Sequence, residues 1–440
     1  MKSEMELKSS LEQFQEEDFG RKMHALIAKL YPICRSITGN GVRETLHIIR
    51  QYIPLIIHEV PTGTTVFDWT VPKEWNVRDA YIKNGLGQKV IDFQESNLHL
   101  ISYSVPIKKK MFLTELKDHL FTLPDRPGWI PYRTTYYKED WGFCLSHNQL
   151  LELKDEEYEV CIDSSLTAGS LTYGEYYLPG ATEDEVLISC HICHPSLCND
   201  NLSGISLATY LAKYLSVLSL RYSYRFLFIP GTIGAITWLS LNENRVFRIK
   251  HGLVVAGVGD SGRITYKKSR RGDAEIDRAV IQALKESDED HEILDFFPYG
   301  YDERQYCSPG FNLPVGCLMR TPYNRYSEYH TSADNLDFVK PEFLEDSLLK
   351  YLEVLNIIEN NRRYLNQYPK CEPQLGKRKL YDGMEGKKKQ VVDPLAMLWV
   401  LNMSDADHSL LDIAMLGQLK FGDVQLAAHA LLEKNLLKEV

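Results

Sequence analysis

The pattern of apolar and polar positions divides the first part of the chain into two segments of different character. Apolar residues recur at spacings of three and four within residues 19–30 and 42–53, which predicts two helices between Glu12 and about Ile57. The runs at residues 65–71 and 98–103 are short, rich in β-branched and aromatic residues, and separated by Pro and Gly. We therefore expect two helices followed by a β-rich subdomain.

Strands and helices alternate after about residue 135. Apolar runs predict strands at residues 186–189, 224–229, 253–256 and 315–319, and amphipathic stretches predict helices at 203–217, 235–241 and 274–284. Such alternation is typical of a mainly parallel sheet that helices cover on both faces. The expected fold class is α/β, as a three-layer α/β/α domain. Its sites should lie where strands end at their carboxyl edge.

The C-terminal part of the chain predicts a separate helical domain. A long helix at residues 341–364 closes the α/β domain, and residues 366–392, basic and rich in Gly and Pro, are interpreted as a linker. Three short helices follow, at residues 395–401, 408–416 and 424–432, in a helix-turn-helix order that suggests a winged helix. The expected domains are an α/β domain at 1–60 and 135–365, an inserted β-rich subdomain at 61–134, a linker at 366–392 and a winged helix at 393–440.

Composition and charge limit the classes of partner. Apolar residues make up 44% of the 440 residues and charged residues 25%, as in globular proteins. The net charge of −10 disfavours nucleic acid and anionic membranes as main partners. Residues 391–440 hold three Lys, no Arg and seven acids, so we expect the winged helix to contact a protein or a second copy instead of DNA.

Location and redox state follow from the same composition. No apolar run approaches the roughly 20 residues of a membrane span, and the charged start is unlike a signal peptide, so we expect a cytoplasmic protein. Nine cysteines, an odd number, are interpreted as reduced thiols. The pair at Cys190 and Cys193 has no second CxxC at zinc-ribbon spacing, which disfavours that kind of site.

Candidate metal ligands stand in three separate loops. His191 follows the strand at 186–189, Asp200 comes nine residues later before a helix, and His330 lies in the polar loop 329–337. Imidazole and carboxylate are zinc ligands. Each residue alone is equally well explained as a loop histidine or a helix N-cap. Three such loops at one edge of one sheet favour a metal site.

These segments resemble the landmarks of a known superfamily. Residues 191–204, 228–234, 301–305 and 329–331 are similar, in that order, to the zinc aminopeptidase superfamily that includes glutamate carboxypeptidase and glutaminyl cyclase. The resemblance implies zinc ligands at His191, Asp200 and His330. Nearly the whole chain resembles bacterial aminopeptidase-like proteins often described as polysaccharide biosynthesis proteins, which carry an inserted β domain and a C-terminal winged helix.

The chain departs from the superfamily at three positions that normally carry a carboxylate. Cys193 stands where an orienting acid is usual, residues 230–232 replace an acidic pair, and residues 256–259 replace a ligand Asp, although Asp260 follows. The resemblance therefore implies three ligands for one zinc ion, with the fourth position open. An open position is the pattern of a catalytic zinc site.

A hydrolase would also need a carboxylate as general base. Glu303 is the first candidate, followed by Asp302 and Glu328, and the alternative for Glu303 is a surface or salt-bridged acid beside Arg304. His194 is either a further ligand or a side chain that supports the ligands.

Two features are candidates for substrate binding. Arg270 and Arg271 lie in a basic segment and could hold a carboxylate or phosphate, and the alternative is a solvated basic turn. Tyr301 belongs to a group of tyrosines that suits a sugar or peptide pocket, although tyrosine also fills half-buried surface.

The function that these observations favour is a zinc-dependent, aminopeptidase-like hydrolase of a peptide or amide bond, with a role in polysaccharide biosynthesis. Its substrate would be a peptide or an amide-containing small molecule. The alternative is a catalytically altered metal-binding scaffold with the peptidase fold. A DNA-binding regulator is the third hypothesis, and the acidic tail disfavours it.

Overall fold

The computed structural model describes residues 18–380 and 392–440, which form two compact units. Unit 2 contains residues 18–272 and 291–349, and unit 1 contains the described residues of 273–290 and 350–440. The expected helix start at Glu12 and part of the expected linker, including the lysines at 387–389, lie outside the described residues.

Unit 2 is built on an eight-stranded, mainly parallel sheet. Its order is β1-β10-β12-β11-β13-β16-β14-β15. The four strands β12, β11, β13 and β16 are parallel to one another, whereas β1 and β10 at one side and the β14–β16 pair are antiparallel. The strands are β1 (Ile56–Pro61), β10 (Ser170–Leu178), β11 (Glu185–His191), β12 (Ser223–Ile229), β13 (Ile249–Val255), β14 (Ile264–Lys267), β15 (His291–Leu294) and β16 (Val315–Met319).

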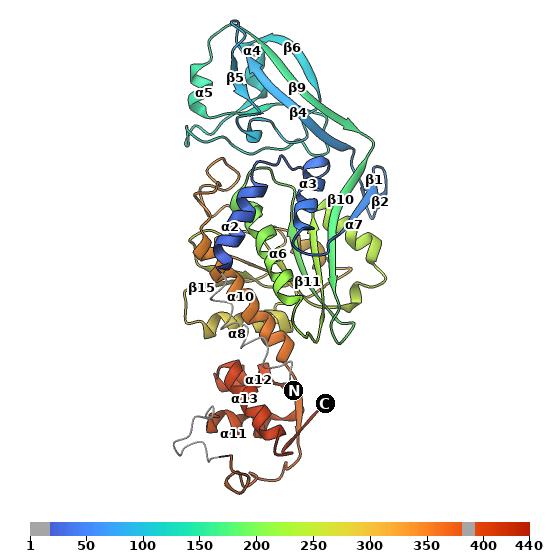
Figure 1. Cartoon of the computed structure of the whole chain (residues 1–440), viewed down its shortest axis with the longest axis vertical. Helices are drawn as coiled ribbons and strands as arrows, with labels where there is room; N and C mark the ends of the chain where they lie inside the picture. Colours follow the sequence, from blue (N-terminus) through green and yellow to red (C-terminus); the bar gives the residue numbers. More distant parts are fainter. Residues whose placement is uncertain (1–17, 381–391) are drawn as a thin grey trace. The chain divides into compact units, whose positions relative to one another are not determined.

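Every residue of the central strands β11 and β12 is buried. Because alternate side chains of a strand point to opposite faces, both faces of the sheet are covered there. Leu187 and Leu227 pack in one core cluster with Ile233, at the start of α7. The other face meets α6, which contacts β11, β12 and β13, while α3 contacts β10 and α2 contacts α6 (Figure 1). The helices of this unit are α2 (Phe19–Leu30), α3 (Asn40–Ile49), α4 (Leu113–Leu116), α5 (His147–Glu152), α6 (Gly204–Leu215), α7 (Ile233–Asn242) and α9 (Glu303–Tyr306). The α/β fold class predicted from the sequence is confirmed.

A second sheet follows the first two helices. Its order is β5-β4-β9-β6, and all three pairings are antiparallel. Its strands are β4 (Glu74–Lys83), β5 (Lys89–Asp92), β6 (Ile107–Phe112) and β9 (Glu157–Thr167). Strand β9 leads almost directly into β10 of the large sheet (Figure 1). The β-rich region expected at 61–134 thus forms its sheet with a strand that comes after residue 134, a pairing between distant segments that local pattern does not reveal.

Two local predictions need correction. The run at 65–71 is not one strand but a hairpin of β2 (Thr65–Val66) and β3 (Trp69–Thr70). The run at 98–103 begins in a short helical turn at Asn97–His99 and then makes only isolated bridges, through Leu100 and Ser102. A further short pair joins β7 (Leu120–Phe121) to β8 (Phe143–Cys144).

Unit 1 contains the C-terminal helices and a small sheet. Its helices are α8 (Glu275–Glu286), α11 (Pro394–Met403), α12 (Leu410–Gly417) and α13 (Phe421–Leu432), and α10 (Pro341–Asn360) ends in it. Strand β17 (Arg363–Asn366) pairs with both β18 (Asp405–Ser409) and β19 (Leu437–Glu439). The three helices expected in the tail are confirmed, and their sheet recruits a strand that begins before the expected linker. No described helix is long and apolar enough to cross a membrane.

Candidate metal centre

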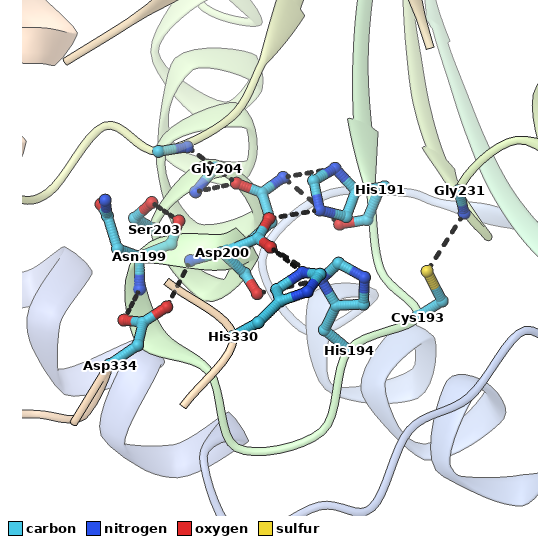
Figure 2. A network of polar contacts seen from close by, with 12 residues as sticks. His191, Cys193, His194, Asn199, Asp200, Ser203, Gly204, Gly231, His330 and Asp334 are labelled. Atoms are coloured by element: carbon cyan, nitrogen blue, oxygen red, sulfur yellow. Dashed lines mark hydrogen bonds and ion pairs between the residues drawn. The ribbon is translucent and has the colours of Figure 1, made fainter. Parts of the chain in front are cut away.

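Three histidines surround one buried carboxylate in unit 2. His191 is the last residue of β11, and its Nε2 lies 2.8 Å from Asp200 Oδ1. His330, from the loop after β16, has its Nε2 2.9 Å from Asp200 Oδ2. His194 has its Nδ1 3.2 Å from the same oxygen. Figure 2 shows the three rings around the carboxylate. The three loops expected to meet at the sheet edge do meet.

The turn that carries Asp200 is fixed to the end of β13 by neighbouring polar side chains. Asn201 Nδ2 donates to the Val255 carbonyl at 2.9 Å, and its Oδ1 accepts from Gly204 N at 3.2 Å. Ser203 Oγ donates to the Asn199 carbonyl at 2.7 Å and accepts from the backbone after β13. These hydrogen bonds within the segment from Asn199 to Gly204 and to the end of β13 fix the position of Asp200 at the sheet edge.

Asp334 supports this turn from the loop of His330. Its Oδ1 accepts the N–H of Asn199 at 2.6 Å, and its Oδ2 accepts the N–H of Asp200 at 3.0 Å. The side chain is fully buried, and burial raises the pKa of its carboxyl to about 8. Asp334 therefore links the loop of one candidate ligand to the backbone of another.

We expect Asp334→Asn to weaken zinc binding roughly 10–100-fold, the range for loss of a group that orients a ligand. An amide can accept only one of the two backbone N–H bonds, and its NH₂ group would face the other N–H. Competition for zinc against a coloured chelator measures the affinity. Asp337→Asn is the matched control, because Asp337 is exposed on the same loop and should leave the affinity unchanged.

The carboxylate charge dominates the electrostatics of the centre. Burial opposes ionisation of Asp200, but His194, His191 and His330 outweigh it and hold the pKa of this carboxyl well below its usual range. Burial lowers the pKa of His191. A neutral imidazole is the form that binds a metal ion.

His194 lies close enough to be a fourth ligand, since its donor atom and those of His191 and Asp200 all lie within 4.8 Å of one another. Its Nδ1, however, also lies 3.1 Å from the carbonyl oxygen of Asp200. A carbonyl oxygen only accepts hydrogen bonds, so this contact requires a hydrogen on Nδ1, whereas metal binding through Nδ1 requires its removal. His194 is therefore either a support for the backbone and carboxylate of Asp200 or a further ligand.

Tyrosine rings line the three histidines. Tyr301 stacks on His191 with ring centroids 5.1 Å apart, and Tyr329 stacks on His330 at 3.9 Å. Tyr132 presents an edge to His330 at 5.1 Å, and its backbone N–H donates to the His330 carbonyl at 2.8 Å. Sequence reasoning missed Tyr132 because it follows a proline-rich stretch, and its only signal was membership of a tyrosine-rich chain.

The positions that lack a carboxylate lie beside His191. Gly231 N donates to Cys193 Sγ at 3.2 Å. A side chain at position 231 would place its Cβ 3.6 Å from the Cβ of His191. The thiol thus holds the turn at 230–232 against the first candidate ligand. Asp260, which follows β13, accepts hydrogen bonds from Asn199 and Thr321, so it serves as a support and not as a ligand in this arrangement.

The three candidate bases accept hydrogen bonds from different partners. Glu303 is fully buried, and its Oε1 accepts a hydrogen bond from Lys267 Nζ at 2.8 Å, which favours a structural ion pair. Asp302 instead accepts the N–H of Thr232 at 2.7 Å, in the turn beside His191. Glu328 is half-buried and accepts from Ser327 Oγ at 2.9 Å.

The two arginines named as substrate-binding candidates lie in an exposed turn. Arg270 Nη1 donates to Asn312 Oδ1 at 3.0 Å, and Arg271 Nε donates to the Asn312 carbonyl at 2.8 Å. No contact of either arginine with the three histidines occurs among the described residues. The arrangement favours the solvated turn over a substrate clamp, whereas Tyr301 lies directly against His191.

The donor set fits a zinc ion. Two imidazoles that face a shared carboxylate, with polar groups behind each, are the ligand types and supports of zinc sites. The His330 side chain is 35% exposed, whereas those of His191 and Asp200 are buried. Access to the centre therefore comes from the His330 side.

Comparison with known proteins places the chain in a family. The model of a domain of unknown function, DUF4910, matches residues 24–361, and a winged helix-turn-helix model matches residues 362–439. A Clostridium acetobutylicum protein, named for polysaccharide biosynthesis and an aminopeptidase-like domain, is 57% identical over 421 residues, which is 96% of this chain and 97% of that protein.

Solved structures agree on the fold. The crystal structure of a Clostridium acetobutylicum protein covers 98% of this chain and all of its own, at 55% identity and a TM-score of 0.93. A zinc aminopeptidase of Bacillus subtilis matches 76% of this chain and 94% of its own, at 11% identity and a TM-score of 0.55. The predicted resemblance to aminopeptidase-like proteins with a C-terminal winged helix is confirmed.

Proposed function

The chain belongs to the DUF4910 family, and from its aminopeptidase-like domain we propose that it is a zinc-dependent hydrolase of peptide or amide bonds. One observation carries the proposal. His191 and His330, from separate segments, converge on the carboxylate of Asp200 at the carboxyl edge of a parallel sheet. In α/β folds this edge is where catalytic groups gather.

His191, Asp200 and His330 would hold the ion, with the fourth position open to water or substrate. A bound zinc ion supplies a Lewis acid and lowers the pKa of water to about 7. The residues of the chain would supply the rest: His194 and Asp334 orient Asp200, and Tyr301 and Tyr329 hold the His191 and His330 rings by stacking. Preorganised groups of this kind cost little reorganisation during reaction.

The substrate class follows from the walls of the centre and from the names of relatives. Tyr301, Tyr132 and Tyr329 offer flat rings with hydroxyl groups, which suit a peptide or a sugar. A relative is named for polysaccharide biosynthesis, so an N-acylated sugar is included beside N-terminal amino acids. The C-terminal winged helix would contact a second copy or another protein, as its excess of acids disfavours DNA.

Removal of the metal ion tests the proposed function. We expect the purified chain to contain about one zinc ion, and chelation to abolish hydrolysis of at least one member of a panel of aminoacyl amides and N-acyl sugars. Added zinc should restore the rate, and added magnesium should not, because Mg²⁺ prefers oxygen ligands. Elemental analysis and product release measure the two quantities.

A zinc-loaded chain that hydrolyses nothing in the panel would contradict the proposal and favour the alternative of a metal-binding scaffold. A chain that binds no zinc would contradict both.

A further inference from the structure

The turn at residues 230–232 runs beside the candidate metal centre without a carboxylate of its own. Gly231 has no side chain, and a Cβ atom at this position would lie 3.6 Å from the Cβ of His191. Hydrolysis of an amide nevertheless needs a group that takes a proton from water and passes it to the leaving nitrogen. A group from another element must therefore transfer the proton here if the chain is a hydrolase, and a carboxylate is the group that the superfamily uses.

Asp302 places a carboxylate against this turn from a different loop. It precedes α9, is 3% exposed, and its Oδ1 accepts the N–H of Thr232 at 2.7 Å. Its Oδ2 accepts no hydrogen bond from the described residues. One oxygen thus fixes the carboxylate, and the other remains available to receive a proton.

The surroundings of Asp302 locate it near the histidines. The preceding residue, Tyr301, stacks on His191. Burial raises the pKa of the Cys193 thiol to about 12, and the charge of Asp302 adds to that rise. The charge of His194 in turn acts on Asp302. Asp302 therefore follows directly on a residue that contacts His191, and its carboxylate is bonded to Thr232, the neighbour of Gly231.

We propose that Asp302 is the general base and acid of this centre, in place of the acid missing from residues 230–232. The inference rests on the proposed function and names the residue that completes it. Asp302 would supply, from a neighbouring loop, the carboxylate that residues 230–232 lack.

The proton balance of the step is simple. The water oxygen forms a bond to the carbonyl carbon while one water proton moves to Asp302 Oδ2. The bond from that carbon to nitrogen then breaks, and the nitrogen takes the proton from Asp302. Water is consumed, the acid and amine fragments are released, and Asp302 returns to its charged form.

The protonation behaviour of Asp302 supports this role. Burial, with a contribution from Glu303, raises the pKa of its carboxyl to about 7, although the Thr232 N–H bond opposes the rise. A base with a pKa near neutral pH accepts and returns a proton readily. Because the base must be charged to act, kcat/KM should fall as the pH drops below about 7.

The decisive variant is Asp302→Asn, which keeps an oxygen for the Thr232 N–H but cannot take a proton. We expect kcat/KM to fall roughly 100- to 10,000-fold, the contribution of a general base. Zinc content and zinc affinity should stay at the wild-type level. Asp295→Asn is the matched control and should keep its rate, because the Asp295 side chain is 90% exposed. Glu303→Gln is assayed where circular dichroism shows it folded.

A second readout does not depend on turnover. Aspartate labelled with ¹³C at its carboxyl carbon gives one NMR signal per residue, and the signal missing from Asp302→Asn identifies Asp302. In the zinc-free protein that signal should titrate near pH 7.

The outcomes separate the two proposals. No turnover by the zinc-loaded wild-type chain overturns the proposed function and the base role together. Wild-type turnover that persists in Asp302→Asn overturns only the base role, as does loss of zinc from that variant, which would make Asp302 a ligand. A titration of Asp302 at an ordinary carboxyl pH would also count against it.

Discussion

The His191→Ala chain is expected to lose its zinc under conditions in which the wild-type chain holds about one ion. His191 offers an imidazole nitrogen 2.8 Å from Asp200 Oδ1 and is almost fully buried. Its removal takes away a ligand, so the affinity should fall by more than the roughly 10–100-fold that follows loss of a supporting group. Elemental analysis after gel filtration measures the zinc content.

Two further variants make this prediction specific. His194→Ala should retain zinc with an affinity lowered roughly 10–100-fold if His194 supports Asp200 through its hydrogen bond and is not itself a ligand. His47→Ala should bind zinc as the wild type does, since His47 is exposed on α3. Equal zinc in the wild type and His191→Ala would refute the ligand assignment. Equal loss in His191→Ala and His194→Ala would make His194 a ligand.

Lys267→Met is expected to destabilise the folded state by about 3–5 kcal/mol, the usual result of removing one partner of a buried ion pair. Lys267 is 1% exposed, and its Nζ lies 2.8 Å from Glu303 Oε1. The same nitrogen donates to the Tyr299 carbonyl at 2.7 Å. Without the lysine, the Glu303 carboxylate stays buried with no cation, beside the loop that carries Asp302.

Chemical denaturation, followed by tryptophan fluorescence, measures this loss as a lowered midpoint. Lys268→Met is the matched control, because the partner of Lys268 is Asp295, whose side chain is 90% exposed, and such pairs contribute about 0–1 kcal/mol. The double variant Lys267→Met, Glu303→Gln should recover part of the loss, since no unpaired charge remains. If Lys267→Met shifted the midpoint no more than Lys268→Met, the ion pair would have no structural role.

His191 and Asp200 could be found from the sequence because each stands next to a segment with a strong local signal. The strand before His191 is an apolar run, and the helix after Asp200 has a helical repeat, so chain order alone placed both residues at one sheet edge. Chain order could not reveal which other side chains contact the candidate ligands. Tyr132 and Asp334 reach the centre through contacts with residues far along the chain.

The assignment of the acids shows the same limit. Glu303 and Asp302 are neighbours in sequence, and the pattern favoured Glu303 as the base. In the structure Glu303 pairs with Lys267, 36 positions away, while Asp302 meets Thr232, 70 positions away. Asp302 precedes helix α9 and Glu303 begins it, and only packing decides which of them meets a lysine.

The sequence by itself determined the α/β class, the winged-helix tail and three residues that gather at one edge, because periodicity and strand-to-loop order are local properties of the chain. Tertiary structure alone decided that His194 lies against Asp200, that Arg270 and Arg271 lie on an exposed turn, and that Asp302 and not Glu303 bonds the turn beside His191. These choices depend on burial and on partners far apart in sequence. Such contacts form only when the loops are brought together by the sheet that carries them.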